Sequence, residues 1–448
     1  MAVDLMEQIV SLAKRRGFVY PSAELYGGTG AVWDFGPYGN RMKNNIKSFW
    51  YRRFVQERDD IIDIDSAILI KREVLAASGH EKQFNDMMVE CKKCKQRFRA
   101  DHQIPEAKDH KHDLGEPKQF NLMFKTNLGP VEDPEHIGYL RPETAQGMFT
   151  NFKTILDTSR KKVPFGIAQI GKSFRNEITT GNFIFRAREF EIGEIEFFVK
   201  PGTDDEWFKK WVDEWGKFFE ECGLKKEKLR RYNHPKESLA HYSKGTTDYE
   251  YEFPFGWGEI AGIANRTDFD LKAHEKHSGK ELRYFDEKTG EKYVPYVIEP
   301  TLGIERLMLA LLVDGYDVIK PATSDQQPEN QEYVLRLNPK IAPIKAAVFP
   351  LVNKDKLPAI AREIYEDLRA WKHVEYDDSG SIGRRYRRQD EIGTIAGITV
   401  DFQTLKDNTV TIRDRDTMKQ IRIKRSEIRD VIGQMIEGKE FKKLGKIK

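Results

Sequence analysis

Arg175 and Glu177 stand two residues apart, and Arg186 and Phe190 stand four apart beyond an intervening loop at 178–185. Because successive side chains alternate across a strand, each pair would lie on one face of a hairpin arm. A planar guanidinium suits bidentate contact with a phosphate or a carboxylate, and an aromatic ring suits stacking on a base. The pattern therefore favours a nucleotide-binding hairpin. Taken alone, these residues also fit a surface hairpin with a cross-strand Arg–Glu pair.

A second phosphate-binding pattern lies directly upstream of this hairpin. Residues Gly166 to Ser173 satisfy the P-loop formula G-x-x-x-x-G-K-S. A P-loop needs a flexible loop that leads into a helix whose N-terminus faces the phosphate. The intervening Ile, Ala, Gln and Ile favour a strand, and the Arg/Glu hairpin follows where the helix would begin. We therefore predict a strand at this position and no P-loop.

Three further segments carry residues that suit chemistry on anions. Arg141 to Gly147 (RPETAQG) has the Pro and Glu typical of a helix start. Gly256 to Ile260 (GWGEI) places the acid Glu259 after a turn. Glu299 to Arg306 (EPTLGIER) joins an apolar strand to an apolar helix. A helix N-terminus with a Gly and an Arg in its first turn is a natural anion-binding site.

In combination these segments resemble a known enzyme family. The pattern F-R-x-E, loop, R-x-x-x-F resembles motif 2 of the class II aminoacyl-tRNA synthetases. The segments LRPETAQG and ANRTDFDLK (264–272) resemble glycyl-tRNA synthetases of the bacterial homodimeric type, and the likeness covers essentially the whole chain in order. The resemblance implies ATP-dependent attachment of glycine to tRNA(Gly) through a glycyl-adenylate. It also implies a homodimer whose interface involves motif 1, around Asn40 to Ser66.

The resemblance implies a role for each matched residue around ATP. Arg175 would hold the α-phosphate and the amino-acid carboxylate, and Glu177 would read the adenine amino group. Arg186 and Arg306 would hold the γ-phosphate, and Phe190 would stack on adenine. Arg175, Arg306 and Glu259 would be catalytic, and Glu259 would also bind the Mg²⁺ that accompanies ATP. The full set implied for ATP is Arg175, Asn176, Glu177, Phe185, Arg186, Phe190, Glu259, Ile260, Gly303, Ile304, Glu305 and Arg306.

A glycine pocket cannot grip a side chain, so it must bind the ammonium with acids and exclude larger amino acids sterically. The residues implied for glycine are Arg99, Glu143, Phe190, Glu191, Ile192, Gly193, Glu194, Glu299, Pro300, Thr301, Leu302 and Gly303. Some depart from the family pattern, because Thr301 stands where Ser is usual and Ile192-Gly193 replace Gln-Met. We expect the Thr301 methyl to tighten the pocket and Gly193 to enlarge it.

Cysteine is rare, with 3 in the chain. Cys91 and Cys94 form half of a zinc site, which His102, His110 or His112 could complete. No second Cys pair exists, and Cys222 is remote in sequence. We therefore interpret Cys91 and Cys94 as two free thiols, with a zinc site as the alternative.

Length and charge bound the kind of protein. At 448 residues the chain has room for two or three domains. No apolar run approaches the roughly 20 residues of a membrane span, and Asp4 and Glu7 interrupt the apolar N-terminus, so we expect a cytoplasmic protein without a membrane partner. Residues 341–448 carry 23 Lys/Arg against 17 Asp/Glu, within a net charge of +3. This surplus, with the run Arg384 to Arg388, fits an RNA partner, and solvated surface charge is the simpler explanation.

The elements that must position these residues follow from periodicity. The pattern predicts helices at 4–16 and 40–58 and around Trp207, Trp211 and Trp215, and a strand at 61–65. Beyond residue 340 it predicts strands at 344–352, 374–376, 398–405 and 410–414 and helices at 355–371 and 381–389. The fold class expected is α+β. Residues 1–335 would form a class II catalytic domain, an antiparallel sheet flanked by helices, with a loop-rich insertion at about 85–138. Residues 340–448 would form a mixed α/β anticodon-binding domain.

Two alternatives carry different functions. One is another class IIa synthetase, threonyl-, prolyl- or seryl-like, against which the glycine-type segments argue. The other is a non-catalytic paralogue that binds nucleic acid. Such a paralogue should lose the phosphate-binding arginines, whereas Arg175, Arg186 and Arg306 are all present.

Overall fold

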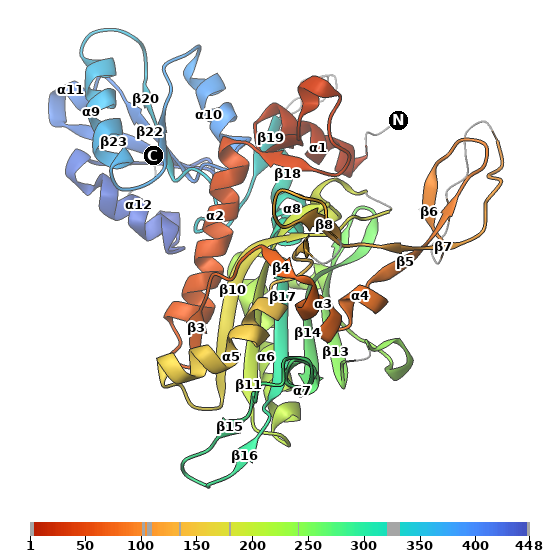
Figure 1. The fold of residues 1–448 in the computed structure, drawn as a ribbon. Coiled ribbons are helices and arrows are strands. Elements are labelled where there is room, and N and C mark those ends of the chain that lie inside the picture. Colours follow the sequence, from red (N-terminus) through yellow and green to blue (C-terminus); the bar gives the residue numbers. More distant parts are fainter. Residues whose placement is uncertain are drawn as a thin grey trace.

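The computed structural model describes residues 4–100, 104, 110–133, 136–178, 181–240, 242–319 and 332–445. A seven-stranded sheet dominates this part of the chain (Figure 1). Its strands are β3 (Ile61–Asp63), β10 (Phe165–Phe174), β11 (Glu189–Val199), β12 (Leu229–Asn233), β13 (Gly245–Phe253), β14 (Gly256–Thr267) and β17 (Tyr296–Gly303). They lie in the order β12-β13-β14-β17-β11-β10-β3. Neighbours are antiparallel, except that β10 and β3 are parallel.

Helices cover both faces of this sheet, because neighbouring residues of a strand point in opposite directions. Phe198 of β11 lies 4.5 Å between ring centroids from Phe152 of α5 (Ala145–Ser159). The preceding residue, Phe197, lies 5.3 Å from Trp211 of α6 (Asp204–Cys222). The predicted tryptophan helix is therefore α6, and its tryptophans pack in the core. Helix α7 (Phe269–Ser278) packs on the α5 side and α8 (Ile304–Gly315) on the α6 side.

The N-terminal elements agree with the sequence pattern. Helix α1 spans Leu5–Arg15, and α2 spans Pro37–Tyr51 and continues as a π-helix over Arg52–Gln56. Between them, β1 (Val19–Pro21) and β2 (Trp33–Phe35) pair antiparallel, with a 3-10 turn at Glu24–Tyr26. Trp50 and Phe54 are buried in the core with Trp215, which anchors α2 to the main sheet.

Strand β10 decides between the two phosphate-binding patterns. The residues that match the P-loop formula lie inside β10, paired along their length with β11, so the prediction of a strand is confirmed. The predicted hairpin extends too far along the chain, because its strands end earlier than we expected. Because β10 ends at Phe174 and β11 begins at Glu189, Arg175 and Glu177 lie in the connection. Buried Phe183 and Ile184, around the 3-10 turn η4 (Phe183–Phe185), hold this connection in place of a continued ladder.

An inserted arm, defined here as residues 85–121, projects away from the main sheet (Figure 1). It contains β5 (Asn85–Glu90), β6 (Arg97–Arg99) and β7 (Lys118–Asn121), in the order β6-β5-β7. At its base β4 (Leu69–Lys71), β9 (Ile137–Leu140) and β8 (Phe124–Asn127) form another sheet, beside α3 (Arg72–Ala77) and α4 (His80–Gln83). Short strands thus occupy the segment that we expected to be loop-rich.

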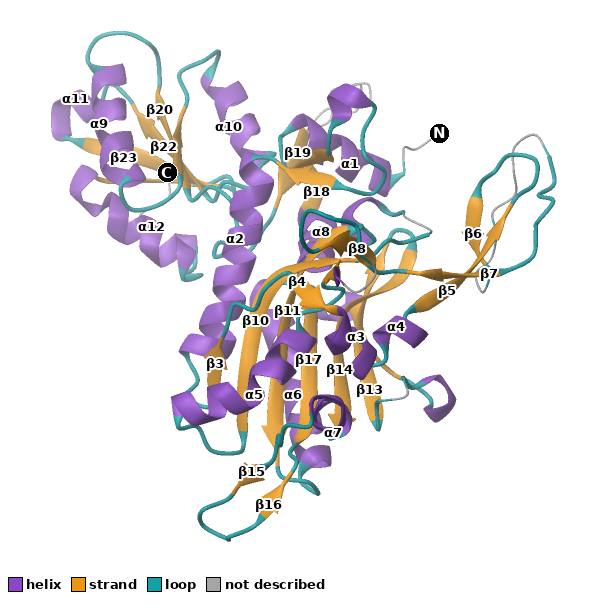
Figure 2. Ribbon diagram, viewed as in Figure 1, coloured by secondary structure: helices purple, strands orange, loops and turns teal. Residues whose placement is uncertain are grey.

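A mixed five-stranded sheet forms the C-terminal part (Figure 2). Its strands are β20 (Ala346–Pro350), β21 (Val374–Tyr376), β22 (Ala396–Val400), β23 (Thr409–Asp414) and β24 (Gln420–Lys424), in the order β21-β20-β22-β23-β24. The helices are α9 (Leu357–Arg369), α10 (Ile382–Asp390), α11 (Thr404–Asp407) and α12 (Ile428–Ile436). The predicted elements are present, except that the strand expected at 398–405 ends at Val400 and α11 follows it; α11, β24 and α12 were not predicted. Two hairpins complete the described chain: β15 (Tyr284–Phe285) with β16 (Lys292–Tyr293), and β18 (Tyr316–Ile319) with β19 (Glu332–Leu335).

Polar contacts join the C-terminal part to α2 and to the end of α1. Arg16 Nε lies 2.6 Å from the Glu391 carboxylate, and the Tyr38 hydroxyl donates to Glu375 at 2.7 Å. Asn45 donates to the carbonyls of residues 341 and 342 at 3.1 and 2.9 Å. The long helix α2 therefore contacts both sheets.

Candidate active site

One cavity gathers most of the residues singled out by the sequence. It is bounded by the β10–β11 connection, β11, β14, β17 and the start of α8. The predicted site residues that line it are Arg175, Glu177, Phe185, Arg186, Phe190, Ile192, Glu194, Glu259, Thr301, Gly303, Glu305 and Arg306. Strand β17 pairs with β11 on one side and with β14 on the other. This pairing brings together residues that are far apart in the sequence.

Three arginines reach this cavity from separate elements. Arg175 donates to the Pro142 carbonyl at 3.1 Å and lies over the Phe190 ring at 5.4 Å. Arg306, in the first turn of α8, pairs with Glu259 at 3.0 Å. The Arg186 side chain has no hydrogen bond or ion pair within the described residues, and its charge is therefore available to a ligand. Cations at a helix N-terminus and a strand end make a site for several phosphate oxygens.

Aromatic rings form one wall of the cavity. Phe185 lies under the Arg306 guanidinium at 4.7 Å and packs edge-on against Phe253 at 5.3 Å. Gly258 leaves room for this ring, since a Cβ there would come within 2.8 Å of it. These cation–π contacts place the Arg175 and Arg306 guanidinium groups over aromatic rings without neutralising their charge. A flat, π-rich wall beside three arginines suits a purine nucleotide.

A buried group of carboxylates lies at the inner end of the cavity. Glu194 is 2% exposed and accepts the Thr144 N–H at 2.7 Å, with a second bond from the Thr144 hydroxyl. Glu299 pairs with Arg266 at 2.7 Å, and Glu143 lies 3.3 Å from His80. Of these acids, Glu194 lines the cavity itself. The acids outnumber the cations that neutralise them, so this end of the cavity favours the binding of an ammonium group.

Burial and mutual repulsion perturb these carboxylates. Burial raises the pKa of Glu194 to about 7, and the negative charge of Glu143 adds to the rise. Burial likewise raises the pKa of Glu299 to about 8, against the opposing charge of Arg266. For Glu143 the effect of burial is outweighed by His80, and its pKa is held below its usual range. Glu196 was not predicted from the sequence. Both its oxygens lack a partner in the described chain, and burial raises its pKa far above normal.

A charged network supports the strand and helix that carry the site. Lys43 of α2 lies 2.7 Å from both Glu191 of β11 and Glu305 of α8. The Glu191 N–H donates to Glu305 at 2.9 Å, and Lys47 adds a second cation at 3.0 Å from Glu191. Lys43 is 8% exposed, so this network is largely removed from water. Glu191 is thus placed to orient the site and does not line the cavity.

Gly193 does not enlarge the pocket, contrary to our expectation. A Cβ at Gly193 would lie 3.2 Å from the Trp50 ring, on the face of β11 opposite the cavity-lining Ile192 and Glu194. Strand alternation explains the error, because adjacent residues point to opposite faces. The space above Gly193 is filled by a buried tryptophan of α2.

Several predicted residues lie outside the cavity lining. Ile260, Pro300, Leu302 and Ile304 are buried in the strands and helix that form its walls. The backbone N–H of Asn176 donates a hydrogen bond to the Leu122 carbonyl at 2.7 Å. Arg99 lies on β6 of the inserted arm and pairs with Asp86 at 3.0 Å. Sequence reasoning missed Ile184, in the predicted loop, and Ala187, in the second predicted arm; both line the cavity from the β10–β11 connection.

We interpreted Cys91 and Cys94 as two free thiols, but the structure places two histidines beside them. His110 and His112 contact Cys91 and Cys94, because residues 110–115 run beside β5 and form a bridge between Cys91 and Leu114. His102 lies outside the described residues.

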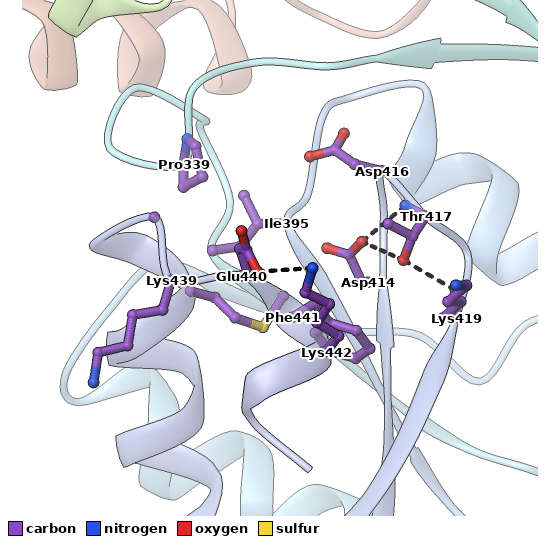
Figure 3. A pocket seen from close by; sticks show the side chains of 12 residues that line it. Pro339, Ile395, Asp414, Asp416, Thr417, Lys419, Lys439, Glu440, Phe441 and Lys442 are labelled. Carbon is purple, nitrogen blue, oxygen red and sulfur yellow. Dashed lines mark hydrogen bonds and ion pairs between the residues drawn. The ribbon is translucent and has the colours of Figure 1, made fainter. Parts of the chain in front are cut away.

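A further pocket in the C-terminal part contains none of the predicted site residues (Figure 3). Its polar groups contact one another: Asp414 accepts from the Thr417 N–H and hydroxyl at 2.8 and 2.7 Å, and Lys442 pairs with Glu440 at 3.1 Å. The pocket therefore offers little unsatisfied polarity to a ligand.

Comparison with known proteins agrees with the geometry. Residues 124–314, which contain every residue lining the cavity, match the tRNA synthetase class II core domain (G, H, P, S and T). Residues 345–435 match the anticodon binding domain. The chain is 51% identical to the glycine–tRNA ligase of Bifidobacterium longum, over 97% of this chain and 94% of that protein. It is 54% identical to the glycine–tRNA ligase of Caldanaerobacter subterraneus (93% and 95% covered) and 50% identical to that of Thermobifida fusca (97% and 99%).

The chain belongs to the glycine–tRNA ligase family. This membership confirms the class II resemblance and the α+β fold class inferred from the sequence. The threonyl-, prolyl- and seryl-like alternatives receive no support from the relatives named above. Within the described residues, no helix is long and apolar enough to cross a membrane.

Proposed function

We propose that this chain activates glycine with ATP and transfers the glycyl group to tRNA(Gly). The observation that carries the proposal is the convergence of Arg175, Arg186 and Arg306 on one cavity whose inner end is acidic at Glu194. A cation-rich end suits a triphosphate, and an acidic end suits the ammonium of an amino acid. The carboxylate of that amino acid would then meet the α-phosphate between the two ends.

The first step follows from charge. A glycine carboxylate oxygen bonds to the α-phosphorus while the bond to pyrophosphate breaks, so negative charge accumulates where two anions meet. Arg175, at the boundary of the cationic and acidic ends, would stabilise that charge, and Arg186 and Arg306 would hold the γ-phosphate. No protein nucleophile is needed, because positioning and electrostatic stabilisation supply the catalysis. The tRNA 3′ hydroxyl then attacks the carbonyl carbon, and AMP leaves.

Glu259 fits the role of a Mg²⁺ ligand. Its carboxylate lines the cavity, is 47% exposed and faces the phosphate-binding Arg306. Mg²⁺ in nucleotide sites takes one or two carboxylates and completes its shell with phosphate oxygens and water. Bound there, the ion would neutralise phosphate charge and favour departure of pyrophosphate.

Selection of glycine rests on the inner end of the cavity. Glu194 would bind the ammonium, and Glu143, whose pKa is held below its usual range, would reinforce the negative potential. Glu299 would line the same end of the site, paired with Arg266. Thr301 lies opposite Glu194 in the β11–β17 pairing and lines the same cavity. Its methyl group would occupy space that the side chain of a larger amino acid needs.

We further propose a division of labour along the chain. Residues 1–335 would form the catalytic domain and residues 340–448 the anticodon-binding domain, which carries the surplus of positive charge. Two copies would pair through the region around α2, as in a homodimer, and act in the cytoplasm where tRNA is charged. Sedimentation of the full-length protein tests the dimer directly.

Amino-acid-dependent ATP–pyrophosphate exchange, run across all twenty amino acids, tests the activity. We expect glycine alone to support exchange and tRNA(Gly) to accept the product. Comparable exchange with serine or alanine would contradict the substrate assignment. No exchange with any amino acid, with tRNA binding intact, would favour the non-catalytic paralogue.

A further inference from the structure

Four metal-binding side chains meet at the outer part of the inserted arm. The ligand atoms of Cys91, Cys94, His110 and His112 all lie within 4.8 Å of one another. Cys91 Sγ is 3.7 Å from His110 Nε2, and Cys94 Sγ is 3.7 Å from His112 Nδ1. With Zn–S bonds of about 2.3 Å and Zn–N bonds of about 2.0 Å, a tetrahedral zinc separates its S and N ligands by about 3.5 Å. The observed sulfur–nitrogen distances are close to that value.

The backbone around the cysteine pair forms a tight turn that presents both sulfurs to one side. The Cys91 N–H donates to the residue 96 carbonyl at 2.8 Å, and the Lys95 N–H donates to the Cys91 carbonyl at 2.9 Å. Lys95 adopts a φ of +60°, which closes the turn. The turn thereby brings the Cys91 and Cys94 sulfurs to the same place, as two ligands of one metal ion require.

The histidines are held against this turn by a strand-like segment. The Lys92 N–H donates to the Asp113 carbonyl at 2.7 Å, and the Gly115 N–H donates to the Glu90 carbonyl at 2.9 Å. Because His110 and His112 are two residues apart on an extended segment, their side chains share one face. The Phe98 ring packs edge-on against His112 at 4.8 Å and restricts its orientation. Backbone hydrogen bonds and ring packing of the protein itself therefore bring the four ligand side chains together.

The arm has few other sources of stability. Among its described residues, Val89 and Cys91 alone are buried. A small module with so little apolar burial needs a further cross-link to hold its chains together. A metal ion at this point would tie β5, β6 and residues 110–115 to one another.

We propose that Cys91, Cys94, His110 and His112 bind one structural Zn²⁺ ion. Two sulfurs and two imidazoles are a donor set that zinc prefers, and four protein ligands leave no position open for catalysis. The two histidines lie on an extended segment and not on a helix, unlike those of the zinc fingers that enter the DNA major groove. The ion therefore serves the fold of the arm, which lies outside the cavity described above.

The zinc content of the purified full-length protein tests this proposal. After supplementation with zinc and desalting, we expect stoichiometric zinc in the natural protein and its loss in Cys94→Ser and His112→Ala. His136→Ala is the matched control, because His136 is an exposed histidine paired with Asp133 at 2.7 Å outside the cluster. It should retain zinc. A natural protein without zinc, or a Cys94→Ser variant with as much as the natural protein, would overturn the proposal.

Substitution of Co²⁺ for zinc gives a second test that can be read from the natural protein itself, whether or not the variants fold. In the natural protein, Co²⁺ alone should give thiolate charge-transfer absorption in the near ultraviolet and intense visible bands of a tetrahedral site. Both should be absent from Cys94→Ser. Binding of Co²⁺ without thiolate absorption would also exclude these cysteines as ligands.

Discussion

Arg175 and Lys172 are three residues apart, yet the structure gives them different surroundings. Arg175 lines the cavity beside Phe190, whereas Lys172 sits inside β10 and pairs with Glu189. Arg175→Ala should lower the rate of glycine activation by on the order of a hundredfold or more, comparable to removal of one oxyanion-hole donor. Lys172→Ala should change it far less. Pyrophosphate exchange measures both variants, and the reverse order of effects would restore the P-loop interpretation.

The raised pKa of Glu194 predicts a pH-dependent affinity for glycine. Its carboxylate has a pKa of about 7 in the free protein, so it is mostly neutral below that pH and charged above it. Only the charged form attracts an ammonium group strongly. The KM for glycine should therefore fall as the pH rises through about 7, while the KM for ATP does not follow the same curve. A glycine KM that is constant across this range would contradict the assigned role of Glu194.

At the residue scale, the sequence predicted the three arginines of the cavity but missed a buried acid beside it. Arg175, Arg186 and Arg306 stand in recognisable patterns, and all three line the cavity. Glu196 has no pattern of its own. Its burial and its proximity to Glu299 depend on how β11 packs against its neighbours, which residue types alone do not determine.

Strand β11 carries functional residues on one face and packing residues on the other. Gly193 lies under Trp50, so Gly193→Val should destabilise the fold by about 1–3 kcal/mol, as overpacking of a filled core does. Gly245→Ala is a suitable control, because a Cβ at Gly245 would meet nothing within 4 Å. Equilibrium unfolding in urea measures both. Equal stability of the two variants would mean that the Trp50 ring moves aside without cost.

The basic run in α10 shows why charge patterns predict partners poorly. Arg385 is 3% exposed and donates at 2.8 Å to the Asp378 and Gly380 carbonyls. Arg388 pairs with Asp377, and Arg387 pairs with Glu332. Arg384 is exposed and has no side-chain hydrogen bond or ion pair within the described residues. Most of this run stabilises the C-terminal part, and Arg384 is the arginine best placed for RNA.

Periodic elements were predicted well from sequence, and irregular ones were not. Helices α1, α2, α6 and α9 and strand β21 follow the apolar spacing closely. The sequence predicted strands on both sides of a loop at 178–185, because the alternating charges mimic a surface hairpin, whereas residues 175–188 all lie in the β10–β11 connection. Its path is set by buried Phe183 and Ile184, whose partners are distant in sequence.

At the scale of the whole molecule, the two sheets are joined through α2 and by apolar contact. The main hydrophobic cluster runs from Leu335 through Ile344 into the C-terminal sheet, so the parts share a core. A protein truncated after Leu335 should unfold at a lower temperature, because it loses the contacts of Arg16 and Tyr38 with this part. It should still activate glycine, since every cavity residue remains.

Transfer to tRNA should fall much more steeply than activation in the truncated protein. The anticodon-binding region and the concentrated positive charge are removed together. Paired assays of pyrophosphate exchange and tRNA charging measure the difference. Equal losses in both assays, with the protein still folded, would mean that the C-terminal part is not a dedicated RNA-binding module.

Lys43 also constrains how this chain can evolve. It neutralises two carboxylates that belong to different elements, Glu191 and Glu305. Replacing one member of such a buried group leaves an uncompensated charge, at a cost of about 3–5 kcal/mol, which is a large share of a protein's stability. Single substitutions at these positions should therefore be eliminated by selection, even where the new residue fits the space. Descendants of this sequence should keep all three residues or exchange them together.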